Sequence, residues 1–393
     1  MIARWLASAL LFAAMPASSV AMASEPKPVG PPSAPGYVPI GRDEQGLWAE
    51  AAEHERELKE SKLIVRDAAV NAYLRHVLCR TVGEEKCAAI RLYLVRAPIF
   101  NADMGPSGVL RIYTGLLLRI RDEAELAAIL GHEFTHFENR HSLSDMRKRR
   151  SATNWGAWLT IASFAGSNPR NFMPDFLVSY YAYSRDQERE ADLAGLHRMS
   201  DAGYRAMAAS NVWMHLREEK DAQARGLGIR SLKDADYGPF ASHPMDVERM
   251  TYLAREGQAF STPQRAFDGL DDYRAHLAPI WPMLIDDQIK LNDFGGSEYV
   301  LDNLARGDWT GPLLYARAEL YRSRGLIDQL TAEALYRQAI VRADAPPATW
   351  RGLGLVLLRN GRADEGRAML RDYLRRVPDA VDRAALQAMA DGM

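Results

Sequence analysis

Several things are scarce in this 393-residue sequence. It has two cysteines and nine histidines, and 49 Lys and Arg against 51 Asp and Glu leave a net charge of −2. Two cysteines exclude a disulfide scaffold and a four-thiolate zinc site. Without a basic excess, composition gives nucleic acid no support as the main partner. Beyond residue 23, no apolar run approaches the roughly 20 residues that a membrane-crossing helix needs, so we expect a soluble mature chain.

An apolar stretch does occur near the start of the sequence. Arg4 precedes a run from Trp5 to Met15, and small residues with the triplet 21–23 (Ala-Met-Ala) follow. This layout predicts a signal peptide over residues 1–23, cleaved before Ser24. The alternative, a retained membrane anchor, would need a longer apolar run. We therefore expect export to the periplasm.

The expected export affects what the two cysteines are predicted to form. Cys79 and Cys87 have seven residues between them. An oxidising compartment favours a disulfide over two free thiols, so we expect a local disulfide between them.

The periodicity of the sequence predicts a mainly α fold with a small β-sheet. Residues 24–42 contain six prolines and are expected to be an extended segment. Apolar residues at helical spacing follow over 43–78, whereas alternation near Ile90 and over Val109–Thr114 predicts strands. Residues 151–183 are either a hydrophobic flap or part of the core. Residues 221–242, rich in glycine and charge, are expected to be a loop.

Two helices have clear start signals. Asp122 can cap a helix that runs to His141, with Glu125 in the position that reaches back as in a capping box. Ser184 and Gln187 repeat the pattern for a helix that ends near residue 200.

A repeat occupies the last ninety residues. It has the tetratricopeptide spacing of small and large residues, in two copies, the first with two residues inserted after Gly325. Two copies are fewer than the three or so that a free-standing array needs, so the repeats are expected to lean on residues 266–304 or on the preceding domain. The copy that shows the spacing most clearly contains Trp350, Leu353, Gly354, Leu357, Gly361, Leu370, Tyr373 and Pro378.

The first helix carries the sequence HExxH at His132, Glu133 and His136. Residues four apart lie on nearly the same helix face, so both imidazoles can reach one zinc ion. Glu133 can then meet a water on the open side of the metal, whose pKa falls towards about 7, and act as general base.

The third metal ligand is expected on the second helix. The extended metzincin pattern is absent, because Asn139 and Ser142 stand where it needs glycine and histidine. Glu188 and Asp192 lie one turn apart, which suits a gluzincin: Glu188 binds zinc and Asp192 fixes the tautomer of a ligand histidine. We expect Glu190 on a solvated face, and His141 in contact with backbone near the helix end.

These motifs resemble a family of zinc metallopeptidases. His132–His141 reads HExxHxxxRH and Tyr183–Asp192 reads YSRxxExEAD, which is similar to the family that includes HtpX, the CAAX prenyl proteases and the BepA-like periplasmic proteases. The resemblance covers about residues 45–260 and 305–385. In layout it is strongest to the BepA-like proteins, which have a signal peptide and C-terminal tetratricopeptide repeats. Asp103 and Met104 depart from the family, where many members have an aromatic and a small residue.

The resemblance implies roles for further residues. Glu188, and not Glu190, is the third ligand. The HPxxxxR element from His243 to Arg249 lies near the metal, where His243 is a fourth zinc ligand that acts as a switch. On physical grounds, His243 or Arg249 could instead stabilise an oxyanion as catalytic groups.

Substrate binding is expected at a strand. The strand made of Val109, Leu110, Arg111, Ile112 and Tyr113 is either the edge to which an extended substrate adds or an ordinary core strand.

Together these inferences predict an exported endopeptidase with one Zn²⁺ per chain. Its domains would be a gluzincin-like metallopeptidase over 43–265, a connecting helical segment over 266–304 and repeats over 305–393. The resemblance implies quality control in the envelope, with misfolded or stalled outer-membrane proteins as possible substrates. The repeats would bind an envelope protein. Peripheral association with the membrane is a further possibility. The alternative is a periplasmic chaperone or assembly scaffold with a latent zinc site, blocked by His243 and the 221–242 loop.

Overall fold

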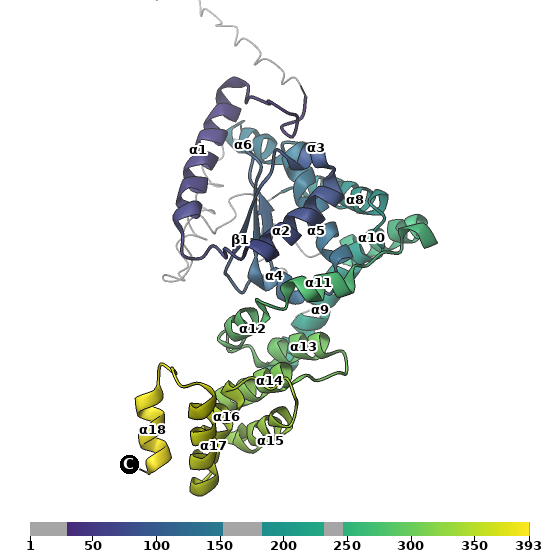
Figure 1. Cartoon of the computed structure of the whole chain (residues 1–393). Helices are drawn as coiled ribbons and strands as arrows, with labels where there is room; N and C mark the ends of the chain where they lie inside the picture. Colours follow the sequence, from purple (N-terminus) through teal and green to yellow (C-terminus); the bar gives the residue numbers. More distant parts are fainter. Residues whose placement is uncertain (1–29, 152–182, 232–246, 393) are drawn as a thin grey trace, which may run out of the picture.

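The structure is a computed structural model that describes residues 30–151, 183–231 and 247–392. These residues form mostly helices around one small sheet, which confirms the expected fold class (Figure 1). The expected signal peptide, His243 and nearly all of the expected flap lie outside the described residues.

The N-terminal part consists of three helices and three strands. The single helical stretch expected over 43–78 is two helices, because the chain is extended at Ser61 and the Asp67 side chain caps a new helix by accepting a 3.0 Å hydrogen bond from the Val70 N–H. The elements are α1 (Gly41–Glu60), α2 (Ala68–Val82), α3 (Glu84–Cys87), β1 (Arg91–Val95), β2 (Ala102–Met104) and β3 (Val109–Tyr113).

The strand order corrects one expectation from the sequence. β3 pairs in parallel with β1 on one side and antiparallel with β2 on the other, so β3 is the central strand. Its backbone is already paired on both sides, and no substrate strand can add to it. The short strand β2, only three residues long, lies at the edge of the sheet in the described chain and packs against α5.

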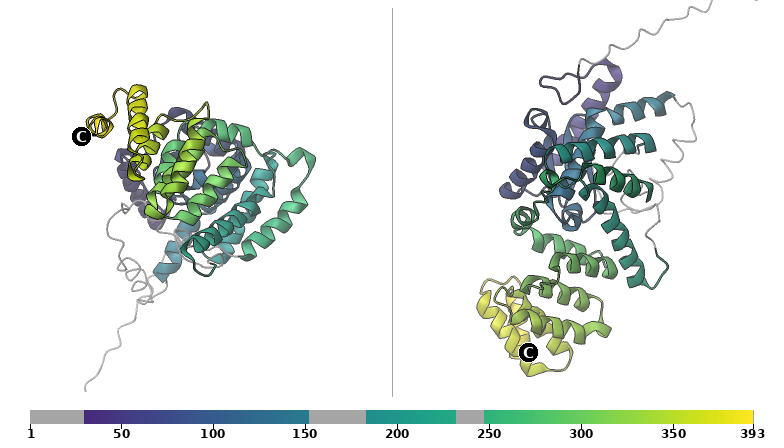
Figure 2. Two further views of the ribbon diagram at one scale, coloured as in Figure 1. Left: turned by 90° about the horizontal axis from the view of Figure 1, so that it is seen from below. Right: turned by 90° about the vertical axis from the view of Figure 1, so that its right-hand side faces the viewer.

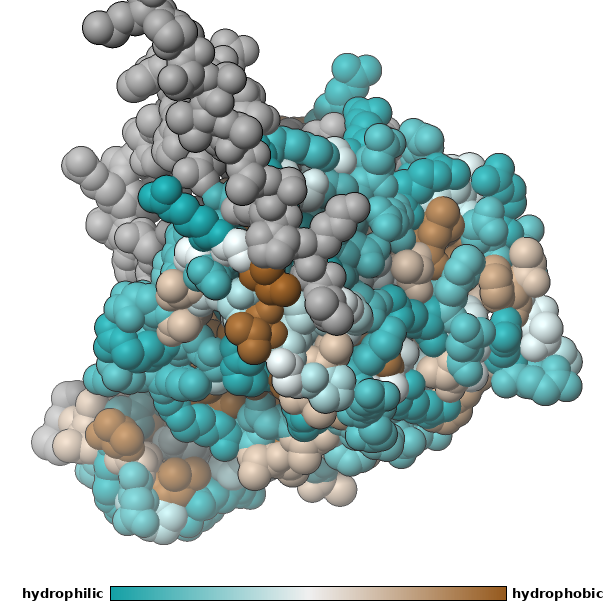
Figure 3. Space-filling model, turned by 90° about the horizontal axis from the view of Figure 1, so that it is seen from above, coloured by the Kyte–Doolittle hydropathy of each residue, from teal (hydrophilic) through white to brown (hydrophobic). Residues whose placement is uncertain are grey.

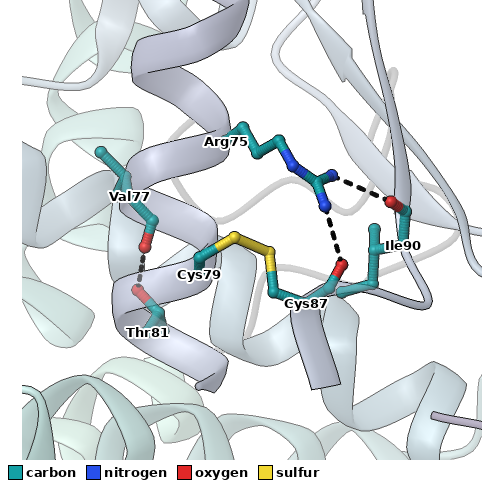
Figure 4. The surroundings of a disulfide bond; sticks show 6 residues. All are labelled: Arg75, Val77, Cys79, Thr81, Cys87 and Ile90. Carbon is teal, nitrogen blue, oxygen red and sulfur yellow. Dashed lines mark hydrogen bonds between the residues drawn. A yellow bond between two sulfur atoms is a disulfide. The ribbon is translucent and has the colours of Figure 1, made fainter. Parts of the chain in front are cut away.

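The disulfide joins the end of α2 to α3. The Cys79 and Cys87 sulfurs are bonded, and both side chains are buried in the main core (Figure 4). Arg75 donates hydrogen bonds to the carbonyl oxygens of Cys87 and Ile90, at 3.3 and 3.1 Å. The disulfide therefore closes the turn that leads from the helices into β1.

The centre of the molecule is α5 (Glu123–Glu138), whose residues are buried from Glu123 to Phe137. Asp122 caps α5 by accepting a 2.9 Å hydrogen bond from the Glu125 N–H. The Glu125 side chain reaches back as expected, but it accepts from the N–H of Arg121, one residue before the cap. The full capping box expected at Ser184 and Gln187 is present at the start of α8.

The helices α5 and α8 approach each other through two glycines. A Cβ atom on Gly195 would lie 2.7 Å from the His132 nitrogen, and one on Gly131 would lie 3.0 Å from the Gly195 oxygen. Only residues without a side chain allow this contact. The elements that surround α5 are α4 (Thr114–Arg119), α6 (His141–Ser151), α8 (Arg185–Asp201), α9 (Ala208–Leu227) and α10 (Val247–Phe260).

The expected loop over 221–242 is wrong in its first part. Helix α9 continues to Leu227 and ends at Gly228, which has a left-handed backbone with φ 68°. Buried alanines at positions 222 and 224 supply the apolar side of this last turn. Gly226 in this turn lies against Gly295, where an added Cβ would be 2.8 Å from the backbone.

The C-terminal part is a series of helices that extends away from the sheet (Figures 1 and 2). The pairs α14 with α15 and α16 with α17 each pack together closely. One side of α14 joins the main core through Leu313 and Leu320, and another joins the second core through Leu314 and Ala318. The elements are η2 (Pro263–Arg265), α11 (Leu270–Leu277), α12 (Trp281–Ile289), α13 (Phe294–Ala305), α14 (Gly311–Ser323), η3 (Leu326–Asp328), α15 (Gln329–Ile340), α16 (Ala348–Arg359), α17 (Ala363–Arg376) and α18 (Arg383–Asp391).

The surface is mainly polar. Seen from above (Figure 3), hydrophilic side chains cover most of the described face, and hydrophobic ones stand in small groups. Within the described residues, no helix combines the length and the apolar character that crossing a bilayer requires.

Gly195→Ala should destabilise the protein by about 1–3 kcal/mol, because its Cβ meets backbone that cannot rotate away. Gly46→Ala is the matched control. Gly46 lies inside α1 with nothing within 4 Å of the added Cβ, so this substitution should stabilise by about 0.5–1 kcal/mol. Denaturant unfolding followed by circular dichroism measures both. Equal effects of the two substitutions would contradict the role given to the helix contact.

Candidate metal centre

Three buried side chains from α5 and α8 converge on one point. His132 and His136, one helical turn apart, bring their Nε2 atoms to 3.1 Å from each other. The Glu188 carboxylate faces both rings, with Oε2 3.6 Å from His132 Nε2 and Oε1 3.6 Å from His136 Nε2. Among the described residues, these three form a group whose ligand atoms all lie within 4.8 Å of one another.

The spacing of these atoms fits a zinc ion. Zinc ligands at about 2.0–2.1 Å in tetrahedral geometry lie roughly 3.3 Å from one another, and the three separations here are 3.1, 3.6 and 3.6 Å. Two imidazoles and one carboxylate are also a donor set that zinc prefers.

The charges of the cluster point the same way. The carboxylates of Glu133, Glu188 and Asp192 are all buried, and Arg249 is a buried cation that contacts Glu188 and Asp192. Three carboxylates and one guanidinium leave two negative charges among these residues. A buried charge without compensation is costly, and a divalent cation would neutralise it.

Asp192 lies behind His132, as the sequence predicted. Its Oδ1 is 2.9 Å from His132 Nδ1. Burial alone would raise the pKa of Asp192, but the charge of Arg249 and the hydrogen bond with His132 outweigh burial and hold it well below its usual value. Asp192 therefore stays ionised and accepts the Nδ1 proton of His132, which leaves Nε2 for the metal.

Arg249 lies near the metal ligands, as the resemblance implied for this element, and its guanidinium binds two carboxylates. Its guanidinium donates two 2.7 Å hydrogen bonds to Asp192, and Nη1 is 2.8 Å from Glu188 Oε2. It also stacks over the Trp213 ring at 4.3 Å and is 5% exposed. This arrangement makes Arg249 a positioning residue for the two carboxylates. His243 lies outside the described residues, so its roles as ligand, switch or catalytic group stay predictions.

The other ligand histidine has partners that the sequence reasoning missed. His136 stacks on Tyr183 with ring centroids 3.9 Å apart, and its Nδ1 is 2.9 Å from Nδ1 of His141. His141 in turn contacts Glu190. His141 was predicted to contact backbone, but its ring nitrogens contact these two side chains instead. Glu190 is 56% exposed, as predicted for a solvated face, and it contacts His141 as well. The spacing could have predicted this contact. His141 follows His136 by five residues, so its imidazole can lie beside His136 at the C-terminal end of α5.

Glu133 is the remaining member of the motif. Its side chain is buried, and Oε1 lies 4.0 Å from His132 Nε2, beside the three ligand atoms. Tyr113 of β3 lies close enough for the charge of Glu133 to act on its hydroxyl; burial and the neighbouring carboxylates raise the pKa of Tyr113 well above its usual value.

Asp103, one of the two residues that depart from the family pattern, binds two side chains of β3. Asp103 of β2 accepts a 2.7 Å hydrogen bond from Arg111 Nε and a 3.0 Å hydrogen bond from the Tyr113 hydroxyl. Both donors come from β3, so this ion pair and hydrogen bond tie the edge strand to the central strand beside the ligand cluster.

Comparison with known proteins agrees with this geometry. Residues 66–256 match the sequence profile of peptidase family M48. These residues form a peptidase family M48 domain. All four site residues, His132, Glu133, His136 and Glu188, fall within the domain, which belongs to a family of zinc metallopeptidases.

Individual relatives match over parts of their length. A candidate beta-barrel assembly-enhancing protease of Vibrio cholerae is 24% identical over 317 residues, which are 76% of this chain and 60% of the relative. The mitochondrial metalloendopeptidase OMA1 of Arabidopsis thaliana is 31% identical over 168 residues, 41% of this chain and 30% of the relative. OMA1 of Schizosaccharomyces pombe is 29% identical over 164 residues, 40% and 48% respectively. The chain thus spans less than two thirds of the length of each.

Arg249→Lys should weaken the M48 site although it keeps the charge, because an ammonium cannot form the paired hydrogen bonds to Asp192 and also reach Glu188. We expect zinc affinity to fall about 10–100-fold and stability to fall by about 1–3 kcal/mol. Competition with a chromophoric chelator and thermal unfolding measure these changes.

The matched control is Arg255→Lys on the same helix, where the side chain is 71% exposed and pairs only with Glu256 in the described residues. It should leave both quantities unchanged. If Arg249→Lys behaves like Arg255→Lys, Arg249 does not position the ligands.

Proposed function

We propose that the chain is an exported zinc-dependent endopeptidase that uses Glu133 as its general base. The observation that carries the proposal is the convergence of His132, His136 and Glu188 beside Glu133, inside an M48 domain. The disulfide between Cys79 and Cys87 supports export, because such bonds persist in oxidising compartments.

The chain's own residues account for the proton transfers. A bound zinc ion would supply Lewis-acid activation of water and of the substrate carbonyl. Glu133 takes a proton at its carboxylate and later delivers it to the leaving amine. Asp192 and Arg249 hold the ligands throughout, because their hydrogen bonds do not involve the reacting atoms.

The edge strand β2 is the proposed place for an extended substrate. Substrate backbone would add next to Ala102–Met104, the strand that packs against α5. Asp103 is held by Arg111 and Tyr113, so β2 is a preorganised edge. This replaces β3, which is paired on both sides.

The physiological substrates are a further part of the proposal. The name of the Vibrio cholerae relative refers to β-barrel assembly, which supports misfolded or stalled outer-membrane proteins as substrates in the periplasm. The C-terminal helix pairs would be tetratricopeptide repeats that bind an envelope partner. Leu326, Ile327 and Leu330 at the inserted turn are 76–85% exposed, and they give this surface an apolar group.

A second candidate function is a chaperone or assembly scaffold with a latent zinc site. The burial of the site favours it: Glu133 and Glu188 are each 3% exposed and His136 is 1% exposed. A substrate would need a movement to reach them. In this case the repeats would carry the function and proteolysis would be dispensable.

Glu133→Gln tests the enzyme. The amide cannot take a proton, so cleavage of an unfolded protein such as casein should fall roughly 10²–10⁴-fold while one zinc per chain is retained. The metal should stay because Glu133 is not one of the three ligand residues. Metal content and cleavage are measured on the same preparation, with Glu53→Gln, an exposed position on α1, as the matched control. Full activity of Glu133→Gln would remove Glu133 as the base.

The two functions separate in a complementation experiment. Glu133→Gln should fail to replace the wild-type protein if proteolysis is the function, whereas Ile327→Glu on the repeat surface should fail if the scaffold is. Ile327 is 85% exposed, so the second substitution leaves the core intact. Complementation by Glu133→Gln together with failure of Ile327→Glu would favour the scaffold.

A further inference from the structure

The two ligand imidazoles are supported in different ways. His132 has the ionised carboxylate of Asp192 at its Nδ1 atom. At the Nδ1 atom of His136 lies a ring nitrogen of His141, 2.9 Å away. A second buried imidazole therefore occupies the place that a carboxylate takes on the other side.

A chain of polar contacts continues from His141 to the surface. His141 Nε2 lies 3.3 Å from Glu190 Oε2, and Asn139 donates a 2.6 Å hydrogen bond to Glu190 Oε1. The His141 ring is 4% exposed, whereas the Glu190 side chain is 56% exposed. A line of three side chains thus leads from solvent to the metal ligands: Glu190, His141 and His136.

Only one arrangement of protons satisfies this line. His136 offers Nε2 to the ligand cluster, so its proton is on Nδ1 and is donated to His141. His141 Nδ1 must then be the acceptor, which places the His141 proton on Nε2. That proton points to the Glu190 carboxylate, so every polar atom of the line has a partner of opposite kind.

The surrounding backbone and rings hold this line in place. Arg140, directly before His141, has φ 53°, a left-handed conformation that is unfavourable for a non-glycine residue. It is held there by hydrogen bonds from its side chain to Glu44 and to the Gly30 carbonyl, at 3.1 and 2.6 Å. The strained turn sends the chain back so that His141 faces α5.

Tyr183 fixes the remaining freedom of His136. The two rings stack with an interplanar angle of 19°, and the Tyr183 hydroxyl lies 3.0 Å from Ser142 Oγ. His136 is therefore held on its face by Tyr183 and at its edge by His141, which meets it at 77°.

We propose that His141 and Glu190 are positioning residues for the metal centre. His141 accepts the Nδ1 proton of His136 and so fixes the tautomer and direction of this ligand, and Glu190 fixes the tautomer of His141. The inference rests on the proposed zinc site and adds to it two residues that do not bind the metal themselves.

Four variants of the full-length protein test the proposal. His141→Leu removes the acceptor at similar volume, and zinc affinity should fall about 10–100-fold. His141→Asn keeps an oxygen near the position of Nδ1, so it should lose only a small part of that affinity. Glu190→Ala should lose a few-fold. His197→Leu, an exposed histidine on α8 that stacks on Phe260, is the matched control and should bind as the wild type does.

Zinc affinity is measured by competition with a chromophoric chelator, and the Co²⁺-loaded proteins are compared by visible absorption. A change in ligand geometry should shift the Co²⁺ bands of His141→Leu but not those of His197→Leu. A purely structural role of His141 would lower thermal stability and leave the Co²⁺ spectrum of the folded protein unchanged, which would overturn the proposal.

Two further results would also overturn it: wild-type zinc affinity in His141→Leu, or equal losses in His141→Leu and His141→Asn. If His141→Leu does not fold, Glu190→Ala tests the proposal, because the Glu190 side chain is largely in solvent. Unchanged zinc affinity of Glu190→Ala would then overturn the proposal. A wild-type protein that binds no zinc would instead contradict the proposed function itself.

Discussion

The close contact between α5 and α8 is the constraint on which the rest of the site depends. Both imidazoles come from α5, and the carboxylates of Glu188 and Asp192 come from α8. The distance between the helix axes therefore sets how far these carboxylates lie from the two rings. The paired glycines at 131 and 195 allow backbone to lie against backbone at the level of His132. A single methyl group at this crossing would move Glu188 and Asp192 away from both rings together.

The same crossing gathers like charges that repel one another. Glu188 and Asp192 are buried one turn apart on α8, and only Arg249 among the described residues brings a buried guanidinium to both. Folding without a metal therefore leaves carboxylates whose desolvation is not fully offset. In this view the metal is part of what makes the fold stable, and metal affinity and folding stability are linked.

Local signals predicted much of this structure. HExxH, the cap at Asp122 and the capping box at Ser184 each depend on residues within one or two turns of a helix, so the sequence shows them directly. The order of the strands could not be predicted this way, because β2 has three residues and no alternation to show. The side-chain partners of Arg249 and Glu190 could not be predicted, because they lie 49 or more residues away in the chain, and spacing along one helix says nothing about them.

Helix α14 has a consequence for the whole molecule. Leu313 and Leu320 belong to the core that surrounds α5, whereas Leu314 and Ala318 belong to the core of the following helix pairs. Helix α14 thus contributes side chains to two hydrophobic cores. If either core opens, apolar side chains of α14 become exposed to water. The C-terminal helices are therefore packed against the preceding part of the chain and not merely linked to it. We therefore expect the stability of the C-terminal helices to depend in part on the packing of the main core, which also contains residues of α5.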